Sequence, residues 1–598
     1  MIPAQYFEAV WMEQSLGDPW LPDNSLSYAQ ALSMDEEDAF PEAQVTALNA
    51  LGFNKSYVPH TYGGTFRNCE TFVAMGRVLA RRNMSVAVAY STMLWSTLGW
   101  LGGSDDQKRE IARWIISHGS FPCLAYSESE HGADLTSNQL SARLNADGTY
   151  TLNGEKWPIN RAIRSDFLVL LARTDDGVHM RNHSLFIVRK DQLSRRYYHL
   201  PRVKTHGLKG CDISGIGFRD CVIPASCRVG EQGHGLELAL KGFQVTRTFC
   251  TALSLGVGDT ALRLVADYAS RRRLYGDAIS RLPHVQDVLA NTYVSQLIAE
   301  CVSIVSARGL HVCPELYSSW SSIAKVEVCH LVDFSCQQLA SVLGARFYMR
   351  DQQGVGIFQK FMRDGAVVSI FDGSSVVCLD SLATLLDTLT REDAPKPEEG
   401  CLHVLFDLES AMPDLDYSRL KLFSRQGDPL LGSVAQLIEQ LDLLNADESC
   451  TAQTLQNIKT GARRFLADVE HLKAQIRQSS VRSGRNSARR LAQAQRYCAV
   501  FGVAACMGIW LFNREKFGSA FKSGLWLSAV LQRGLSAEFA PGTLDPALTS
   551  ALFAQMDEQR QHNEMFSLMR WPLAAAGEAE RNYGFDLEKE NLDEQRTV

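Results

Sequence analysis

The spacing of apolar residues changes twice along the chain. Within residues 1–120, the segments ETFVAMGRVLARR and SDDQKREIARWIISHG repeat apolar residues every three or four positions, which is the period of a helix. Ser104, followed by two acidic residues, is typical of a helix start. From residue 121 to residue 235, short runs such as DFLVLLART and HSLFIVRK are rich in branched and aromatic side chains, and Asp147-Gly148 punctuates them as a hairpin turn does. This second part is predicted to form strands.

Helical spacing returns over residues 236–390 and again over residues 401–598. Between these two parts lies REDAPKPEEG, residues 391–400, whose charges and two prolines are typical of a linker. The predicted fold is therefore mostly α with a central β-domain. A helical N-terminal domain (1–120) and a C-terminal helical domain (236–390) flank a middle β-domain (121–235), and residues 401–598 add a helical extension.

Composition narrows the class of protein. The chain has 598 residues, of which 45% are hydrophobic and 21% are charged, as in ordinary globular proteins. A net charge of -7 argues against a nucleic-acid-binding protein. The 15 cysteines show neither CxxC pairs nor zinc-ligand spacing, which suits a reducing compartment such as the cytoplasm and predicts no metal site. The N-terminus has no apolar core of a secretory signal, and no uninterrupted run reaches the roughly 20 apolar residues of a spanning helix.

Six segments, in this order, carry a family resemblance. They are LAYSESEHGADLTS (124–137), LNGEKWPIN (152–160), GLKGCDISGIGFRDCVIPASCRVGEQGHG (207–235), GFQVTRTF (242–249), ASRRRLYG (269–276) and FMRDGAVVSIFDGSS (361–375). Each segment alone has a plainer interpretation: a polar turn, a packed aromatic, or a solvated basic helix face. Together they resemble the FAD-dependent acyl-CoA dehydrogenase superfamily. That resemblance implies a β-barrel-like middle domain and a four-helix-bundle C-terminal domain.

The resemblance also implies a set of binding residues. A flavin needs fixed hydrogen-bond donors near its ring edge, and an arginine fork suits its pyrophosphate. Matching positions assign FAD binding to Tyr126, Ser127, Ser129, Trp157, Asn160, Arg272, Tyr275, Gln286, Gly344 and Ser374. They assign contact with the substrate to Asp134, Phe243, Thr246 and Gly373.

In this superfamily a carboxylate removes the α-proton of an acyl thioester while the β-hydrogen leaves as hydride to the flavin. The resemblance places that base at Asp372 and an assisting arginine at Arg247. Other members carry the base at the position of Thr246, which cannot serve. Asp is shorter than the usual Glu by about 1.5 Å. Three readings stay open: a shifted backbone, a closer substrate, or chemistry without proton abstraction. Asp372 is also a candidate helix N-cap.

Other positions depart from the family pattern. SVLGARFY, residues 341–348, keeps Gly344 but has Ser341 and Ala345 where the family has Gln and Gly. Pro283 replaces a frequent Gln, although Gln286 remains. These changes concern cofactor contacts that the family makes across a subunit boundary.

The expected function is α,β-dehydrogenation of an acyl thioester carried by CoA or acyl-carrier protein. An electron-transfer flavoprotein or oxygen would accept the electrons, and the protein would be a homodimer or homotetramer. The alternatives are a flavin-dependent monooxygenase or oxidase on the same fold, and an interaction protein that has lost catalysis. Residues 471–514 lack acidic residues and enclose an apolar run. They predict contact with an anionic membrane surface, contact with an acidic carrier protein, or a buried bundle helix.

Overall fold

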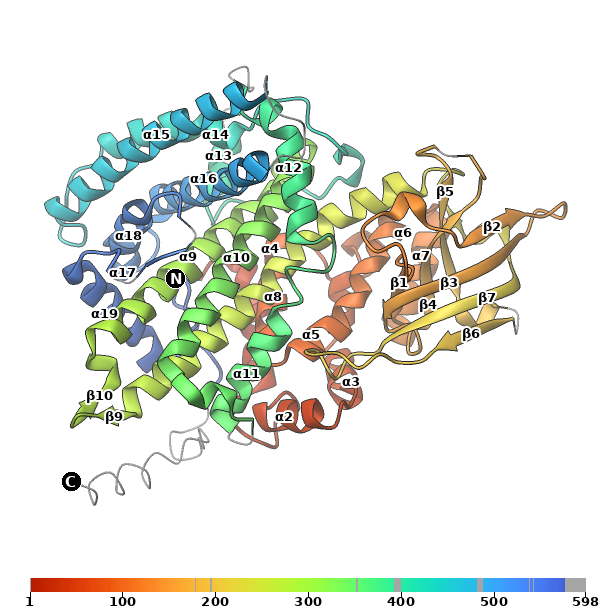
Figure 1. Ribbon diagram of the computed structural model, residues 1–598, viewed down its shortest axis with the longest axis horizontal. Helices are drawn as coiled ribbons and strands as arrows, with labels where there is room; N and C mark the ends of the chain where they lie inside the picture. Colours follow the sequence, from red (N-terminus) through yellow and green to blue (C-terminus); the bar gives the residue numbers. More distant parts are fainter. Residues whose placement is uncertain are drawn as a thin grey trace.

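The computed structural model describes residues 2–177, 179–193, 196–350, 353–391, 400–480, 488–536, 538–540 and 542–575. Its order of elements is the predicted one: helices, then one sheet, then helices to the end of the described chain. Figure 1 shows the sheet on one side of the molecule, the long helices in the middle, and the helices of the extension stacked on their far side. The mostly helical fold with a central β-domain is confirmed.

The N-terminal domain is helical, as predicted. Its α-helices are α1 (Phe7–Leu16), α2 (Tyr28–Glu36), α3 (Glu42–Ala50), α4 (Cys69–Ala80), α5 (Met84–Ser91), α6 (Thr97–Gly102) and α7 (Asp105–His118). Helix α7 begins where its sequence predicts, because Ser104 and Gln107 form a reciprocal capping box. Every residue of α4 is buried, so this helix forms the centre of the domain.

The middle domain is a single curved sheet. Its strands are β1 (Pro122–Ala125), β2 (Ser141–Leu144), β3 (Tyr150–Asn160), β4 (Phe167–Arg173), β5 (His183–Arg189), β6 (Tyr197–Leu200), β7 (Ile213–Ile223) and β8 (Arg228–Val229). The spatial order is β6-β7-β3-β2-β4-β5-β8, and β1 pairs with β4. The predicted turn at Gly148, with φ of 82°, joins antiparallel β2 and β3. Inward-facing residues of the sheet, including Leu168, Phe186 and Ile216, form a core of their own.

Long helices form the bundle that follows the sheet. They are α8 (Gly235–Arg271), α9 (Pro283–Val312), α10 (Tyr317–Leu343), α11 (Gln353–Gly365) and α12 (Ser375–Leu389). A small hairpin of β9 (Arg273–Leu274) and β10 (Asp277–Ala278) joins α8 to α9. Helix α8 packs along both α4 and α10, so it lies at the junction of the N-terminal domain and the bundle.

The extension, defined here as the described part of residues 401–575, packs directly on this bundle. Its helices are α13 (Cys401–Phe406), α14 (Pro429–Asp442), α15 (Ala452–Ser480), α16 (Ala488–Asn513), α17 (Ser519–Lys522), α18 (Leu525–Arg533) and α19 (Pro546–Gln561). Helix α16 lies against α9, α10 and α12, and α19 lies against α9. Extension and bundle share one continuous hydrophobic core. The predicted linker falls on residues 391–400, of which 392–399 lie outside the described residues.

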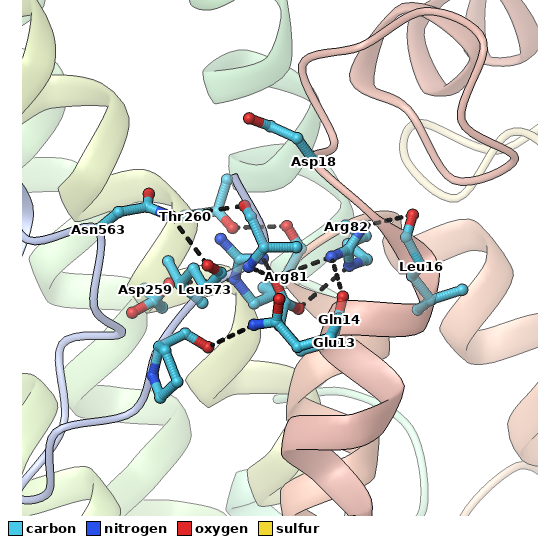
Figure 2. Close-up of polar contacts among 12 residues, drawn as sticks. Glu13, Gln14, Leu16, Asp18, Arg81, Arg82, Asp259, Thr260, Asn563 and Leu573 are labelled. Carbon is cyan, nitrogen blue, oxygen red and sulfur yellow. Dashed lines mark hydrogen bonds and ion pairs between the residues drawn. The ribbon is translucent and has the colours of Figure 1, made fainter. Parts of the chain in front are cut away.

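The end of the extension returns to the N-terminal helices at a buried cluster of charges (Figure 2). Glu13 of α1 pairs with Arg81 at 2.9 Å and with Arg82 at 2.8 Å. The backbone N–H of Ala574 donates to the same Glu13 carboxylate. Arg81 also pairs with Asp259 of α8 at 3.4 Å. Because these groups are buried, the cluster ties together three parts of the chain that are distant in sequence.

In the described chain, the helices α8, α9 and α16 are long and apolar enough to cross a bilayer by length and composition. Their most apolar windows are 100%, 100% and 78% buried inside the protein. Two arginines of the basic stretch 471–514 serve internal ion pairs, Arg490 with Asp387 at 2.9 Å and Arg514 with Asp447 at 2.8 Å. Helix α16 is therefore a buried bundle helix, which was one of the three readings of this stretch.

Candidate active site

The loop between α11 and α12 presents Asp372. Its backbone has a φ of 55°, a left-handed conformation that Asp tolerates better than most residues, and the next residue, Gly373, has a φ of 78°. A side chain at Gly373 would also collide with Arg247, whose Nη2 lies 2.6 Å from an added Cβ. Ser374 caps α12 by accepting a hydrogen bond from the N–H of Val377. The interpretation of Asp372 as the helix cap is therefore wrong, because Ser374 has that role.

The Asp372 carboxylate faces α8. Cys250 donates its thiol hydrogen to Asp372 Oδ2 at a sulfur–oxygen distance of 3.7 Å, and the hydroxyl of Thr246 lies within hydrogen-bonding reach. Burial raises the pKa of Asp372 above its usual value, and the nearby Lys325, Thr246 and Arg247 offset part of that rise. A carboxylate with a raised pKa is a stronger base, as proton abstraction from carbon requires.

Two cations hold the Asp372 loop by its backbone. Lys325 of α10 donates from Nζ to the carbonyl of Phe371, and Arg247 of α8 donates from Nε to the carbonyl of Asp372 at 3.0 Å. Arg247 is in turn held by the hydroxyl of Ser322 at 3.1 Å. Lys325 is fully buried. Sequence reasoning missed Lys325, although a single lysine inside the apolar helix sequence SSIAKVEV is a signal for a partnered buried charge.

A second buried lysine orders the loop that was expected to run beside a flavin. Lys156 of β3 donates to the carbonyl of Tyr126 at 2.9 Å and pairs with Glu128 at 2.8 Å. Glu128 also accepts the backbone N–H groups of Gln139 and Leu140. Burial lowers the pKa of Lys156 to about 8 despite its partner. Sequence reasoning quoted both charged residues within their segments and assigned neither a role.

Two polar atoms beside this loop are buried and have no hydrogen-bond partner among the described residues. They are the hydroxyl of Tyr126 and Oδ1 of Asn160, whose Nδ2 donates to the Val88 carbonyl at 3.1 Å. Unpartnered buried polar atoms are costly and point to a missing ligand or water. Trp157 and Ser129, neighbours of these residues in sequence, border an open hollow of about 570 Å³. The residues present therefore fit a planar polar ring system such as a flavin.

Phe243 of α8 connects the Tyr126 loop with the Asp372 loop. Its ring lies 6.0 Å from the ring of Tyr126, and the Arg247 guanidinium lies 5.8 Å from the centre of the Phe243 ring. Ser127 is half-buried, and its carbonyl accepts from the N–H of Trp157 at 2.9 Å. The structure thus brings Tyr126 and the Asp372 loop to the same segment of α8.

The other predicted residues lie elsewhere. Asp134 is exposed and accepts hydrogen bonds from the hydroxyls of Thr136 and Ser137 in its own turn. Arg272, Tyr275, Gln286 and Gly344 belong to the region around the β9–β10 hairpin. Figure 1 shows this hairpin at the opposite end of the molecule from the sheet. Within one chain, these residues cannot reach a flavin that lies on Trp157.

An apolar cavity lies on the face of α8 opposite the Asp372 loop. Side chains of α4, α6 and α8 form its walls, and Tyr417 of the extension closes one side. Its volume is about 20 Å³. Sequence reasoning could not find this cavity, because its lining comes from segments more than 100 residues apart.

Models of known protein families match the N-terminal domain, the middle domain and the helical bundle of this chain. The N-terminal, middle and C-terminal domain models of acyl-CoA dehydrogenase match residues 26–118, 123–221 and 233–386. The chain belongs to the acyl-CoA dehydrogenase superfamily. The matched segments stop at residue 386, so the family models describe the dehydrogenase core and leave the extension aside.

Individual relatives agree with this assignment. The chain is 28% identical over 355 residues to a probable acyl-CoA dehydrogenase of Mycobacterium leprae, covering 58% of this chain and 88% of that protein. It is 25% identical over 353 residues to the human mitochondrial short-chain specific acyl-CoA dehydrogenase, covering 58% and 83%. A crystal structure of an acyl-CoA dehydrogenase with FAD from Bacillus anthracis has a TM-score of 0.69 at 17% identity, covering 94% and 96%. The structural likeness to the Bacillus anthracis protein therefore extends over the extension as well as the core.

Proposed function

We propose that the protein is an FAD-dependent oxidoreductase that converts an acyl thioester to its 2-enoyl thioester. The observation that carries this proposal is the Asp372 carboxylate, which is half-buried against α8 on a loop whose backbone carbonyls accept hydrogen bonds from Lys325 and Arg247. The unpartnered atoms of Tyr126 and Asn160 support a flavin on the neighbouring side of Phe243. When bound, FAD supplies the acceptor for the β-hydrogen, which leaves the substrate as hydride.

Asp372 removes the α-proton as a general base. The C–H electron pair becomes the new Cα–Cβ π bond as the β-hydrogen departs with its own electron pair, so the carboxylate gains one proton and the acyl chain loses two hydrogens. Desolvation keeps this carboxylate basic, while Lys325 keeps enough of it ionised to act. Arg247 and Lys325 fix the backbone on both sides of the base, which preserves the geometry of proton transfer.

The shorter side chain of Asp372 is consistent with a substrate that lies closer to the loop. The carboxylate reaches Thr246 and Cys250 on α8, so the α-carbon has to pass between the loop and this helix. A carboxylate that faces α8 and not solvent supports the dehydrogenase over the monooxygenase alternative, which does not need this base.

The proposal also involves a second copy of the chain, a carrier for the acyl thioester and an electron acceptor. Tyr275, in the turn between β9 and β10, is 96% exposed at the end of the molecule away from the sheet. Arg272 and Gln286 flank this hairpin, and they are proposed to serve the adenosine pyrophosphate of a flavin bound by a second copy of the chain. CoA or an acyl-carrier protein is the proposed thioester carrier, and an electron-transfer flavoprotein or oxygen is the proposed electron acceptor.

Anaerobic titration with acyl thioesters tests the proposal. The purified protein is expected to be yellow, and its visible flavin absorbance is expected to bleach when an acyl-CoA is added. Asp372→Asn is expected to keep the flavin and lose the bleaching, whereas Asp380→Asn, on α12 nearby, should behave as wild type. Yellow protein that no acyl thioester bleaches would contradict the dehydrogenase, and colourless protein would contradict any flavin enzyme.

A further inference from the structure

A separate cavity lies where the extension meets α9. Figure 1 shows α17, α18 and α19 beside α9, at the left of the molecule, and α18 and α19 both contact this helix. The walls of the cavity come from α9, from these three helices and from the chain just after α19. Its volume is about 70 Å³, which is room for about five water-sized groups. No residue named above in the candidate active site lines it.

Aromatic side chains from two parts of the chain line this cavity. Tyr293 comes from α9, and Phe517, Phe521 and Trp526 come from the extension. The ring centres of Phe517 and Phe521 are 5.1 Å apart, and those of Phe521 and Trp526 are 5.5 Å apart. The faces of aromatic rings attract organic cations, most strongly where water is excluded. Because all four residues are buried, the walls suit an organic cation.

Carboxylates give the cavity a negative electrostatic potential. Glu558 of α19 and Glu564, just after that helix, both line it. Burial and the negative charges of Glu300, Glu558 and Glu564 raise the pKa of Tyr293 above its usual value. The phenol is therefore a neutral O–H group at neutral pH. The same charges that oppose ionisation of the phenol favour a cation placed beside it.

Arg570 is the one cationic side chain that lines the cavity within the described chain. Its Nε donates to the Glu564 carboxylate at 2.8 Å, whereas its Nη2 lies 4.0 Å from the Glu558 carboxylate. Two carboxylates and one guanidinium leave the lining with one negative charge in excess. Glu558 is the more weakly paired of the two carboxylates, so it is the partner that a bound cation finds.

Two polar atoms of the lining residues are buried without a hydrogen-bond partner among the described residues. They are Nε1 of Trp526, which is a donor, and Oε1 of Gln559, which is an acceptor. Trp526 is only 2% exposed. Nε2 of Gln559 donates to the carbonyl of Ser567 at 2.8 Å, and this bond identifies the other amide atom as the oxygen. Such buried atoms point to a ligand that offers one N–H donor and one acceptor.

We propose that this cavity binds a small protonated amine that also carries a hydroxyl group, a ligand of the amino-alcohol class. Its ammonium group donates to Oε1 of Gln559 and pairs with Glu558, and its hydroxyl oxygen accepts from Nε1 of Trp526. A ligand of about five non-hydrogen atoms fills the volume. The bound amine joins the bundle to the extension, because both contribute walls. This binding is independent of the proposed dehydrogenation.

Four compounds with five non-hydrogen atoms each test the proposal by calorimetric titration of the full-length protein at pH 7. They are 3-amino-1-propanol, n-butylamine, which lacks the hydroxyl, 1,3-propanediol, which lacks the charge, and propionate, which has the opposite charge. The amino alcohol is expected to bind tightest and to raise the melting temperature as its concentration rises. We expect n-butylamine to bind about tenfold more weakly, and the diol and propionate to give no binding heat at the same concentrations. Propionate that binds as tightly as the amino alcohol would overturn the proposal, as would a protein that binds none of the four.

Substitutions locate the binding. Glu558→Gln should weaken binding of the amino alcohol about tenfold or more, because the ammonium group loses its carboxylate. Trp526→Phe keeps an aromatic ring and removes the N–H, so it should lower the affinity for the amino alcohol to that for n-butylamine. Glu439→Gln, exposed on α14, makes the same charge change outside the cavity and should bind as wild type.

Wild-type affinity of Glu558→Gln for the amino alcohol would overturn the proposal. A folded Trp526→Phe protein that still prefers the amino alcohol tenfold over n-butylamine would overturn it as well. If Trp526→Phe fails to fold, Gln559→Leu replaces it, and the loss of Oε1 is expected to weaken binding of both amines.

Discussion

At the scale of single residues, the proposed role of Asp372 as the base depends on the groups around it. A carboxylate abstracts a proton from carbon only when it is both desolvated and ionised, and these two requirements oppose one another. Burial raises the pKa of Asp372, and Lys325 is the largest influence that lowers it again. Lys325 also holds the neighbouring Phe371 carbonyl. We therefore regard Lys325 as a positioning residue.

Replacing Lys325 by Met should raise the pKa of Asp372 further. The base would then ionise only at higher pH, so the acidic limb of the kcat profile is expected to move upward by about one pH unit. Steady-state rates across the pH range check this shift. Lys325→Arg should restore part of the wild-type profile, and the exposed Lys421→Met should leave it unchanged. An unshifted acidic limb in Lys325→Met would show that Lys325 does not tune the base.

Replacing Lys156 by Met should weaken flavin retention. The variant leaves Glu128 without its cation and frees the Tyr126 carbonyl, so the loop beside Trp157 loses its order. Breaking a buried ion pair costs about 3 kcal/mol of folding free energy. The ratio of flavin to protein absorbance after gel filtration should fall well below that of Lys204→Met, an exposed control in the same domain. Equal ratios would refute this role.

The sequence could indicate a candidate site residue where that residue lies within a short family motif. It could not indicate contacts between residues that are far apart along the chain. Asp372, Arg247 and Trp157 were assigned because their segments match a family pattern, and their roles stay predictions. Lys325 was missed because its contact with the Asp372 loop depends on α10 lying against α8, which no local pattern encodes. The roles of Asp134 and of the residues around Arg272 stay predictions.

At the scale of elements, the packing of α10 on α16 encloses an ionisable group. Glu327 of α10 is buried, and its Oε2 has no hydrogen-bond partner among the described residues. Burial raises the pKa of Glu327 to about 7, although Arg533 opposes this rise. The unfolded chain ionises at its ordinary pKa near 4.5. The folded protein therefore loses stability as the pH rises from about 4.5 through about 7.

Glu327→Gln removes this pH-dependent cost. Above pH 7 the cost amounts to about 3 kcal/mol, from the difference between the two pKa values. The substitution should thus raise the free energy of unfolding more at pH 8 than at pH 5, as measured by urea denaturation at both pH values. The exposed Glu448→Gln is the control. An equal effect of Glu327→Gln at both pH values would contradict the account.

The spacing of apolar residues predicted where helices lie along the chain better than it predicted which other helices they pack against. The start of α7 was predicted from Ser104, and the turn at Gly148 from its sequence. The environment of α16 was left open, because an apolar helix has the same sequence pattern at a membrane surface and inside a bundle. Its contacts with α9, α10 and α12 show α16 packed in the bundle, while contact of residues 471–514 with a membrane or a carrier protein stays a prediction.

At the scale of the whole molecule, buried charges join the two ends of the described chain. Glu13 neutralises Arg81 and Arg82, and the N–H of Ala574 completes the cluster (Figure 2). If Glu13 is replaced by a neutral residue, the buried guanidinium groups of Arg81 and Arg82 lose a carboxylate that both contact. The cluster therefore couples folding of the extension to folding of the dehydrogenase core.

Glu13→Gln should destabilise the entire protein. We expect a loss of about 3–5 kcal/mol in the free energy of unfolding, the usual cost of removing one partner from a buried pair. Chemical denaturation followed by both fluorescence and circular dichroism checks the loss, and coincident curves are expected. Glu8→Gln, exposed on the same helix, should have almost no effect. A loss below about 1 kcal/mol would mean that the cluster does not join the two parts.

The order of domains was predictable from the sequence, but the arrangement of the extension was not. Its helices were expected as a module beyond a linker, whereas the structure packs them on α9, α10 and α12. Such contacts between segments far apart in sequence leave no periodic signal. The cytoplasmic location and the oligomeric state stay predictions.

Exchange of the substrate α-proton tests the central claim most directly. An acyl-CoA is incubated with the anaerobic, FAD-loaded protein in deuterated water, and loss of the α-proton signal is followed by nuclear magnetic resonance. Wild type and Asp380→Asn are expected to exchange the proton, while Asp372→Asn, with its flavin retained, is expected not to. Exchange by Asp372→Asn at the wild-type rate would contradict the assignment of Asp372 as the base.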